Sequence, residues 1–347
     1  MATGKLHELL RRPVVVAPMA GGPSTPALVI AVAEAGSLAF LAAGYKTVAA
    51  MVDEVDDVRS ATTDPFGVNV FVPGAPTNDP RALAAYLDSL GSDANAVGAA
   101  LGAPAWDDDD FDAKVSALLR AAPAVVSFTF GCPSAEVIAA FRATGTVVAV
   151  TVTAPDEAER AEHAGADALC VQSHEAGAHR GTFTNDTTAA TDDDIVSLIS
   201  RIAAVTPLPQ LAAGGIMDRA QVRAVLAAGA VAAQCGTAFL RSAESGAPPA
   251  HKAALADPRF TETVVTRAFS GRPARGLRNG FIAGHPDAPC AYPEINNATR
   301  PLRAEAAARG DAERMSLWCG VGFRSATDDA VATILERLSP IGGSDNR

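Results

Sequence analysis

A chain of 347 residues is long enough for one α/β barrel of about 250 residues with an added segment. Its 48% hydrophobic content can build a large core, and its net charge of −11 excludes the basic surface that nucleic-acid binding requires. The five cysteines are scattered and form no C-x-x-C pair, so we expect reduced thiols, no disulfide framework and no metal site.

The N-terminal region contains two apolar stretches, and neither resembles a targeting or membrane segment. Basic residues precede the first stretch, but Pro13 and Pro18 interrupt it and no cleavage context follows. The second stretch, residues 27–44, carries Glu34 and Gly36 in its middle, which makes it a poor membrane span. We expect a buried helix followed by a strand, a cytoplasmic location and no membrane partner.

Eight short runs rich in β-branched residues are predicted as strands, and Ala-rich helical segments alternate with them. The runs cover residues 13–17, 37–42, 66–71, 125–130, 146–152, 167–172, 208–213 and 231–235. Strict alternation indicates βα units, and eight of them favour a (β/α)8 TIM barrel over an open doubly wound sheet. No G-x-G-x-x-G follows any of these runs, which further weakens a dinucleotide-binding fold.

Capping residues mark several of the helices between these strands. Thr25 is a predicted N-cap followed by proline, and Gly36 ends the same helix. The sequence Asp218-Arg-Ala-Gln221 resembles a capping box, and Gly229 ends the helix that it begins.

Two connections between strands are longer than the others. Residues 72–124 contain Trp106 followed by four aspartates, which we interpret as a solvated surface patch without chemistry. The loop after the sixth strand begins with residues 172–181, at the end of the barrel where this fold places its active sites. The predicted division is a barrel over residues 1–240 and a C-terminal extension over 241–347, packed on or near the barrel mouth.

The loops after the seventh and eighth strands commonly bind a phosphate in this fold. Here they read Ala213-Gly214-Gly215 and Gln234-Cys235-Gly236-Thr237. Glycines let backbone N–H groups approach phosphate oxygens, the Thr237 hydroxyl adds a donor, and the helix starting near Asp218 points its positive end toward the same place. Glycines at both strand ends favour a phosphate site, and ordinary turns remain the alternative.

Several further segments match the motifs of one known family. They are Ala17-Pro-Met19-Ala-Gly21, Phe66-Gly-Val-Asn69-Val70, Phe130-Gly-Cys-Pro133, Gln172 with Glu175-Ala-Gly177-Ala-His179-Arg-Gly181, Ala212-Ala-Gly-Gly-Ile216, Gly236-Thr-Ala-Phe-Leu240, residues 266–276 and Leu317-Trp-Cys-Gly320. In this order they resemble class I nitronate monooxygenases, formerly called 2-nitropropane dioxygenases, and the likeness spans nearly the whole chain.

The resemblance implies an FMN-binding TIM barrel with a small added domain. It also implies oxidation of alkyl nitronates by O2 to a carbonyl product and nitrite or nitrate, with propionate 3-nitronate as the typical substrate. By motif, the residues expected to contact FMN are Met19, Asn69, Gln172, Gly177, Gly214, Gly215, Gln234, Cys235, Gly236 and Thr237, and His179 is expected to face the substrate.

Two positions depart from the family pattern. Ala178 stands where the family has the second glycine of Glu-Ala-Gly-Gly-His, and Ser173 stands where glycine is common. Because a Cβ at residue 178 disfavours positive φ, we expect the loop to shift slightly, with more effect on substrate geometry than on flavin binding.

A histidine is more often structural than catalytic, but the place of His179 in a loop between Gly177 and Gly181 favours catalysis. An imidazolium or an N–H donor could hold an anionic nitronate, and a neutral imidazole could remove the α-proton of a nitroalkane. His174 is interpreted as a loop-packing residue. Arg180 has two open interpretations, attraction of an anionic substrate or pairing with an aspartate.

The remaining candidates also have ordinary interpretations. The amides of Asn69 and Gln172 could simply satisfy polar groups at the barrel mouth. Cys132 and Cys235 lie near the expected flavin, but a small apolar filling role is favoured for both.

Three other functions compete with nitronate oxidation. An FMN-dependent NAD(P)H:quinone or enoyl reductase could use the same barrel, and a non-enzymatic flavin-binding scaffold is a second possibility. A phosphate-sugar isomerase is the third, and a colourless protein would favour it. The sequence predicts neither the oligomeric state nor the physiological nitronate.

Overall fold

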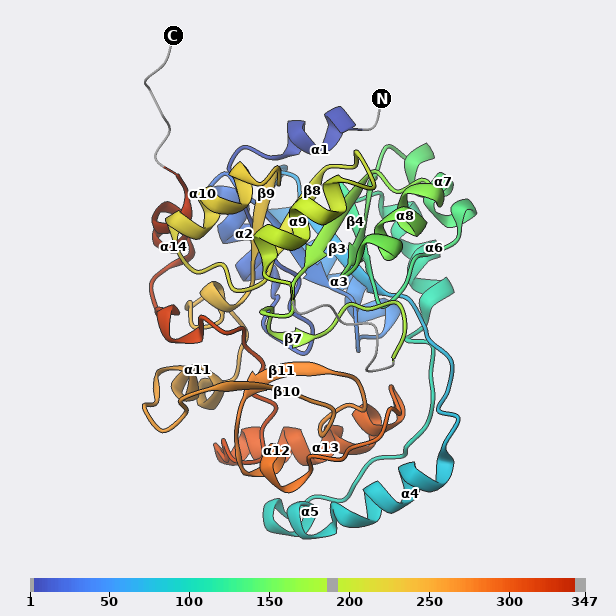
Figure 1. The fold of residues 1–347 in the computed structure, drawn as a ribbon, viewed down its shortest axis with the longest axis vertical. Helices are drawn as coiled ribbons and strands as arrows, with labels where there is room; N and C mark the ends of the chain where they lie inside the picture. The colour runs from blue at the N-terminus through green and yellow to red at the C-terminus, as the bar shows by residue number, and fades with distance from the viewer. Residues whose placement is uncertain (1–2, 186–192, 341–347) are drawn as a thin grey trace.

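The computed structural model describes residues 3–185 and 193–340, and within them eight parallel strands close a barrel in the upper half of Figure 1. The strand order is β1-β2-β3-β4-β5-β6-β8-β9, with β9 paired back onto β1. The bounds are β1 Val14–Val16, β2 Leu38–Ala42, β3 Gly67–Phe71, β4 Val125–Thr129, β5 Val147–Val152, β6 Ala168–Gln172, β8 Gln210–Ala213 and β9 Ala232–Cys235. Each predicted strand corresponds to one of these, so the predicted TIM barrel is confirmed.

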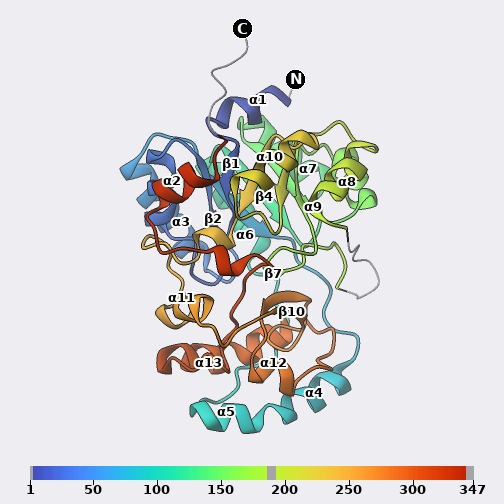
Figure 2. The same ribbon diagram turned by 60° about the vertical axis from the view of Figure 1, so that its left-hand side comes forward.

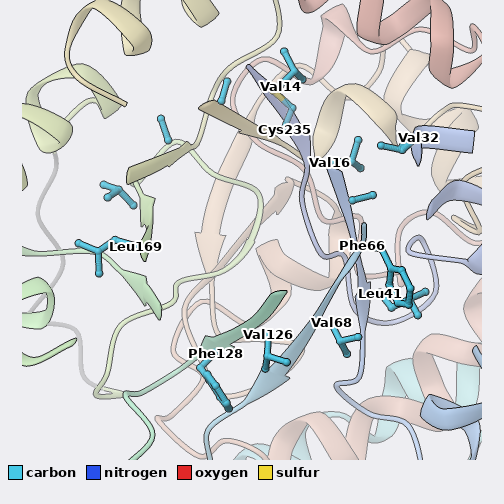
Figure 3. Close-up of a cluster of buried hydrophobic side chains, with 14 of the residues drawn as sticks. Val14, Val16, Val32, Leu41, Phe66, Val68, Val126, Phe128, Leu169 and Cys235 are labelled. Carbon is cyan, nitrogen blue, oxygen red and sulfur yellow. The ribbon is translucent and has the colours of Figure 1, made fainter. Parts of the chain in front are cut away.

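Burial on both faces explains why these strands are continuous apolar runs. Every residue of β1, β2, β3 and β5 is buried, between the helices outside and the packed side chains inside. Figure 3 shows part of this core, including Val14, Val68 and Phe128 from three different strands. At the amino end of the barrel, Leu6 of α1 (Thr3–Leu9) packs in a separate apolar cluster with Phe40 and closes that end.

The helices around the barrel are α2 Pro26–Glu34, α3 Val48–Ala61, α6 Phe111–Ala121, α7 Ala135–Ala143, α8 Pro155–His163, α9 Ile195–Ala203 and α10 Arg219–Ala227. Their predicted caps are present. The Thr25 hydroxyl accepts a hydrogen bond from Leu28 N, and Asp218 and Gln221 form a reciprocal capping box. Over the two described ranges, no helix has both the length and the apolar character needed to cross a membrane.

A second layer of helices lies below the barrel in Figures 1 and 2, and we call it the lower layer. It consists of α4 Pro80–Ser89, α5 Gly91–Val97, α11 Pro249–Ala256, α12 Gly280–Gly284 and α13 Glu294–Arg309. An apolar cluster joins its members, including Leu90 and Phe269. The last helix, α14 (Val331–Leu338), returns to the barrel, where Leu335 belongs to the main core. The expected boundary at residue 240 stays a prediction, since the lower layer also takes in the α4–α5 segment.

A small antiparallel sheet lies between the barrel and the lower layer (Figure 1). It contains β10 (Thr263–Thr266), β11 (Ala274–Leu277) and β7 (Ala178–His179), in the order β10-β11-β7. His179 pairs with Ala274, and Ala178 pairs with Arg275. The expanded loop after β6 is therefore tied to the C-terminal part of the chain, a pairing that the sequence analysis did not predict.

Candidate active site

A cavity of about 590 Å³ lies at the carboxyl ends of the barrel strands, where the lower layer faces the barrel. Its volume is within the usual range of small-molecule and cofactor sites. The predicted site residues all line it: Met19, Asn69, Gln172, Gly177, His179, Gly214, Gly215, Gln234, Cys235, Gly236 and Thr237. The lower layer and the chain that follows it add residues that the sequence analysis did not predict, among them Arg303 and Trp318.

His179 is held in place mainly through its backbone. Its strand β7 pairs with β11, and the Gln172 amide spans the loop from the barrel side. Gln172 Nε2 donates to the His179 carbonyl oxygen at 3.1 Å, and its Oε1 accepts from Gly181 N at 2.8 Å. Gln172 lies at the cavity as predicted, but its amide is engaged in holding the His179 loop.

The His179 ring is surrounded by aromatic side chains and by buried polar groups. Its centroid lies 5.8 Å from that of Phe130, 5.7 Å from Tyr292 and 5.6 Å from Trp318. His179 Nε2 lies 2.8 Å from Ser270 Oγ, and Ser270 Oγ donates to the Arg272 carbonyl oxygen at 3.2 Å. The single Ser270 hydroxyl proton is used in that bond, so Ser270 Oγ accepts from His179 Nε2. This assignment places the imidazole proton on Nε2 and leaves Nδ1 as an acceptor.

Burial and charge both act on the His179 imidazole. Desolvation, followed by the positive charges of Arg272 and Arg303, lowers the pKa of His179 to about 3. The ring is therefore neutral near pH 7. Of the two forms considered from the sequence, the structure favours the neutral imidazole over the imidazolium.

Two arginines near His179 were not identified from the sequence. Arg272 lies over the Phe130 ring, 4.1 Å from its centroid, and donates to the Arg180 carbonyl oxygen. Arg303 of α13 donates to Asn296 and Thr299. Across the described parts of the chain, neither guanidinium has a carboxylate within ion-pair distance. Arg303 lines the cavity, and its charge suits an anion on this side.

The glycine loops at the other side of the cavity have the form expected of a phosphate site. Gly214 has a φ of +129°, and a Cβ there would come within 2.3 Å of Ser173 Oγ. Within the described residues, the N–H groups of Gly214, Gly215 and Gly236 have no acceptor. Thr237 Oγ1 accepts from Gly320 N at 2.9 Å, so its own proton remains available. These donors fit an anionic group such as a terminal phosphate.

The helix expected to point at this place, α10, is self-capped. Gln221 Oε1 accepts from Met217 N at 2.8 Å and from Asp218 N at 3.2 Å, and Asp218 Oδ1 accepts from Gln221 N. The N–H groups of Met217, Asp218 and Gln221 are thus already occupied. The glycine loops supply donors without this competition.

Asn69 and the buried cysteines have mainly local partners. Asn69 Nδ2 donates to Ser127 Oγ at 2.9 Å and to Thr129 Oγ1 at 3.0 Å, which leaves the side-chain Oδ1 for a ligand. Burial raises the pKa of the Cys170 and Cys235 thiols to about 12, so both stay protonated. This agrees with the apolar filling role that was favoured for Cys235.

Three further loop residues can now be placed. His174 Nδ1 lies 3.0 Å from the Asp193 carbonyl oxygen, as a loop-packing residue would. The buried Arg180 side chain donates to the Gln172 carbonyl oxygen at 3.4 Å. Ala178 has a φ of +62° and so lies in the left-handed region, although its methyl group was expected to disfavour that conformation. Its pairing with Arg275 in the small sheet holds it there.

The interpretation of the four aspartates as a solvated patch is wrong for one of them. Asp107, Asp108 and Asp110 are exposed. Asp109 is partly buried and forms an ion pair with the fully buried Lys114.

The chain matches known proteins over almost its whole length. The family model of nitronate monooxygenase matches residues 4–340. A probable nitronate monooxygenase from Staphylococcus aureus (strain Newman) is 36% identical over 340 residues, which cover 94% of this chain and 93% of that protein. The solved nitroalkane oxidase from Streptomyces ansochromogenes is 48% identical with a TM-score of 0.92, covering 96% of both chains. FabK from Thermotoga maritima is 26% identical with a TM-score of 0.72, covering 96% and 94%.

Proposed function

This chain belongs to the nitronate monooxygenase family of oxidoreductases, and we propose that it uses FMN to oxidise alkyl nitronates with O2. The products are a carbonyl compound and nitrite or nitrate. The observation that carries the proposal is a cavity that joins phosphate-type glycine loops to a neutral histidine with arginines nearby.

The residues fit FMN at its phosphate end. The free N–H groups of Gly214, Gly215 and Gly236 and the Thr237 hydroxyl would hold the phosphate. The side-chain Oδ1 of Asn69 offers an acceptor to the ring system. When bound, FMN supplies the electron acceptor for the nitronate and the electron donor for O2.

His179 and the arginines divide the work on the substrate. A nitronate is an anion, and the positive charges of Arg303 and Arg272 attract it to the side of the cavity where His179 lies. His179 Nδ1 can accept a proton, but a pKa of about 3 makes the imidazole a weak base. We therefore expect nitronates, which need no deprotonation, to be better substrates than the corresponding neutral nitroalkanes.

The alternative reductase function can be separated by mixing experiments. Under anaerobic conditions, propionate 3-nitronate should change the flavin spectrum after mixing, and excess NADH or NADPH should leave the flavin oxidised over the same interval. In air, the nitronate should be consumed together with oxygen. Rapid bleaching by NAD(P)H with no response to any nitronate would overturn the proposal.

The cofactor can be identified independently of turnover. Purified protein should be yellow, and flavin released by heat should migrate as FMN. Release of FAD or of no flavin contradicts the assignment of the glycine loops to a single terminal phosphate.

A further inference from the structure

Tyr45 forms part of the cavity wall in an unusual backbone conformation. It lies in the loop between β2 and α3 and has a φ of +67°, which is unfavourable for a residue with a Cβ. Its ring packs on Phe71, with centroids 5.3 Å apart, and its hydroxyl oxygen lies 3.0 Å from that of Tyr292. A tyrosine in this conformation needs external support, because release would let it return to negative φ and carry its ring away from the cavity.

Two side chains provide that support by binding the Tyr45 backbone from both sides. Tyr45 N donates to Asp109 Oδ1 at 3.0 Å, and Arg300 Nη2 of α13 donates to the Tyr45 carbonyl oxygen at 3.0 Å. Arg300 is exposed, whereas Asp109 is partly buried at the end of the loop before α6. Asp109 is thus the more sheltered of the two anchors.

Lys114 fixes the Asp109 carboxylate. Lys114 lies on α6 with a side chain that is 0% exposed, and its Nζ lies 2.8 Å from Asp109 Oδ2. In the described residues, Asp109 is the one ion-pair partner of this buried ammonium. A buried charge must be paired, so Lys114 holds Oδ2 and thereby orients Oδ1 toward Tyr45.

Tyr292 connects the anchored tyrosine to the catalytic candidate. The Tyr292 ring lies 5.7 Å from the His179 ring, and the Tyr45–Tyr292 hydroxyl pair joins the barrel loop to the start of α13 at this point. Phe71 and Phe130, whose centroids are 4.5 Å apart, continue the same wall. Tyr45 thus lines the cavity, and Tyr292 contacts both Tyr45 and the His179 ring.

We propose that Asp109, held by Lys114, is a positioning residue that sets substrate length by keeping Tyr45 against Tyr292. The consequence for substrates rests on the proposed nitronate oxidation, whereas the anchoring of Tyr45 does not. A well-packed wall at this place excludes longer alkyl chains, since each added methylene must find apolar space.

Two double variants isolate the Tyr45 anchor. Asp109→Ala/Lys114→Met removes the acceptor for Tyr45 N and leaves no unpaired buried ammonium. Asp109→Asn/Lys114→Met removes the same ion pair but keeps an oxygen acceptor, and is the matched control. Hydrogen exchange of a peptide covering residues 43–48 should be faster in the alanine variant than in the asparagine variant. Equal exchange in the two would overturn the anchor.

The substrate consequence is measured with ethyl, butyl and hexyl nitronate. The ratio of kcat/KM for hexyl over ethyl nitronate should rise about tenfold in the alanine variant and stay near the parent value in the asparagine variant. Tyr45→Phe removes only the hydroxyl contact with Tyr292 and should shift the ratio in the same direction. If the double variants do not fold, this variant decides whether the Tyr45 wall sets substrate length. An unchanged ratio overturns the length assignment. A parent protein that consumes no nitronate contradicts the proposed function, and the exchange comparison still decides the anchor.

Discussion

Around His179, burial and positive charge act on the imidazole in the same direction. Both disfavour a second proton, so the ring remains neutral and the neighbouring arginines carry the charge that attracts an anion. The Ser270 hydroxyl lies 2.8 Å from Nε2, and within the described residues Nδ1 has no hydrogen-bond partner. In the proposed reaction we therefore expect His179 to hydrogen-bond and place the substrate more than to act as a strong base.

Replacing His179 with alanine tests this role. The His179→Ala protein should fold and retain its flavin, because the backbone pairing of β7 with β11 does not depend on the side chain. Its kcat/KM for nitronates should fall by one or more orders of magnitude, roughly the size of losing a polar catalytic group. His174→Ala, five residues away in the same loop, is the control and should keep most of the turnover. Unchanged turnover in well-folded His179→Ala removes the residue from the mechanism.

The burial of His251 predicts how the free energy of unfolding depends on pH. Its side chain is 5% exposed, its Nε2 lies 3.1 Å from the Trp318 carbonyl oxygen, and burial lowers its pKa to about 4. In the unfolded chain His251 has its ordinary pKa of about 6.5. Between pH 6.5 and 4 the unfolded state therefore holds one proton more than the folded state. The free energy of unfolding should thus fall with decreasing pH in this window, by up to about 1.4 kcal/mol per pH unit from this group.

Urea unfolding at pH 7, 6 and 5 measures the effect. In His251→Asn the pH slope should be smaller than in the parent by up to one proton, whatever the stability of the variant at pH 7. Identical slopes would show that His251 takes up its proton in the folded state.

At the scale of elements, the position of His179 depends on a close approach between two segments. Gly177 precedes β7, and a Cβ there would come within 2.4 Å of the Cys319 carbonyl carbon. In the same segment, Gly320 N donates to Thr237 Oγ1. Residues 319–320 therefore contact both the start of the His179 strand and a glycine loop. A displacement of this segment affects both ends of the cavity.

Gly177→Ala should therefore disturb the site as a whole. We expect a destabilisation of about 1–3 kcal/mol from overpacking, with weaker flavin retention and lower turnover. Gly91→Ala is the matched control, because nothing lies within 4 Å of its added Cβ and it begins α5 away from the cavity. Flavin content and thermal unfolding of the two variants check this, and equal behaviour would contradict the close approach.

The barrel elements were predictable because their signals are local. Each strand is an apolar run with both faces buried, and the caps at Thr25 and Asp218 lie within a few residues of the helices that they begin. Strand β7 has two residues, and its pairing with β11 joins segments about a hundred residues apart, so no local pattern indicates it. The contact of Asp109 with Tyr45 also joins distant segments, and no local pattern indicates it.

For the whole molecule, the position of the cavity explains which site residues could be predicted. The carboxyl ends of parallel barrel strands converge, so residues such as Asn69 and Thr237 follow from the strand assignments together with the family motifs. Arg303 and Trp318 come from the lower layer and the chain after it, whose packing against the barrel is set by long-range contacts. The predicted residues are therefore mainly those of the barrel, and the unpredicted ones mainly those of the opposite wall.

Because both walls contribute, FMN should stabilise the molecule as one unit. A ligand that binds only the folded protein adds about 2.7 kcal/mol at a hundredfold excess over its Kd. Protein stripped of flavin should melt several degrees lower than protein reconstituted with FMN, and each form should show one transition if barrel and lower layer unfold together. Riboflavin, which lacks the phosphate, should restore much less of the shift, because the donors of Gly214, Gly215 and Gly236 would then have no anion to bind. An equal shift with riboflavin and FMN would remove the glycine loops from cofactor binding, and a shift confined to one of two transitions would show that the cavity does not couple the layers.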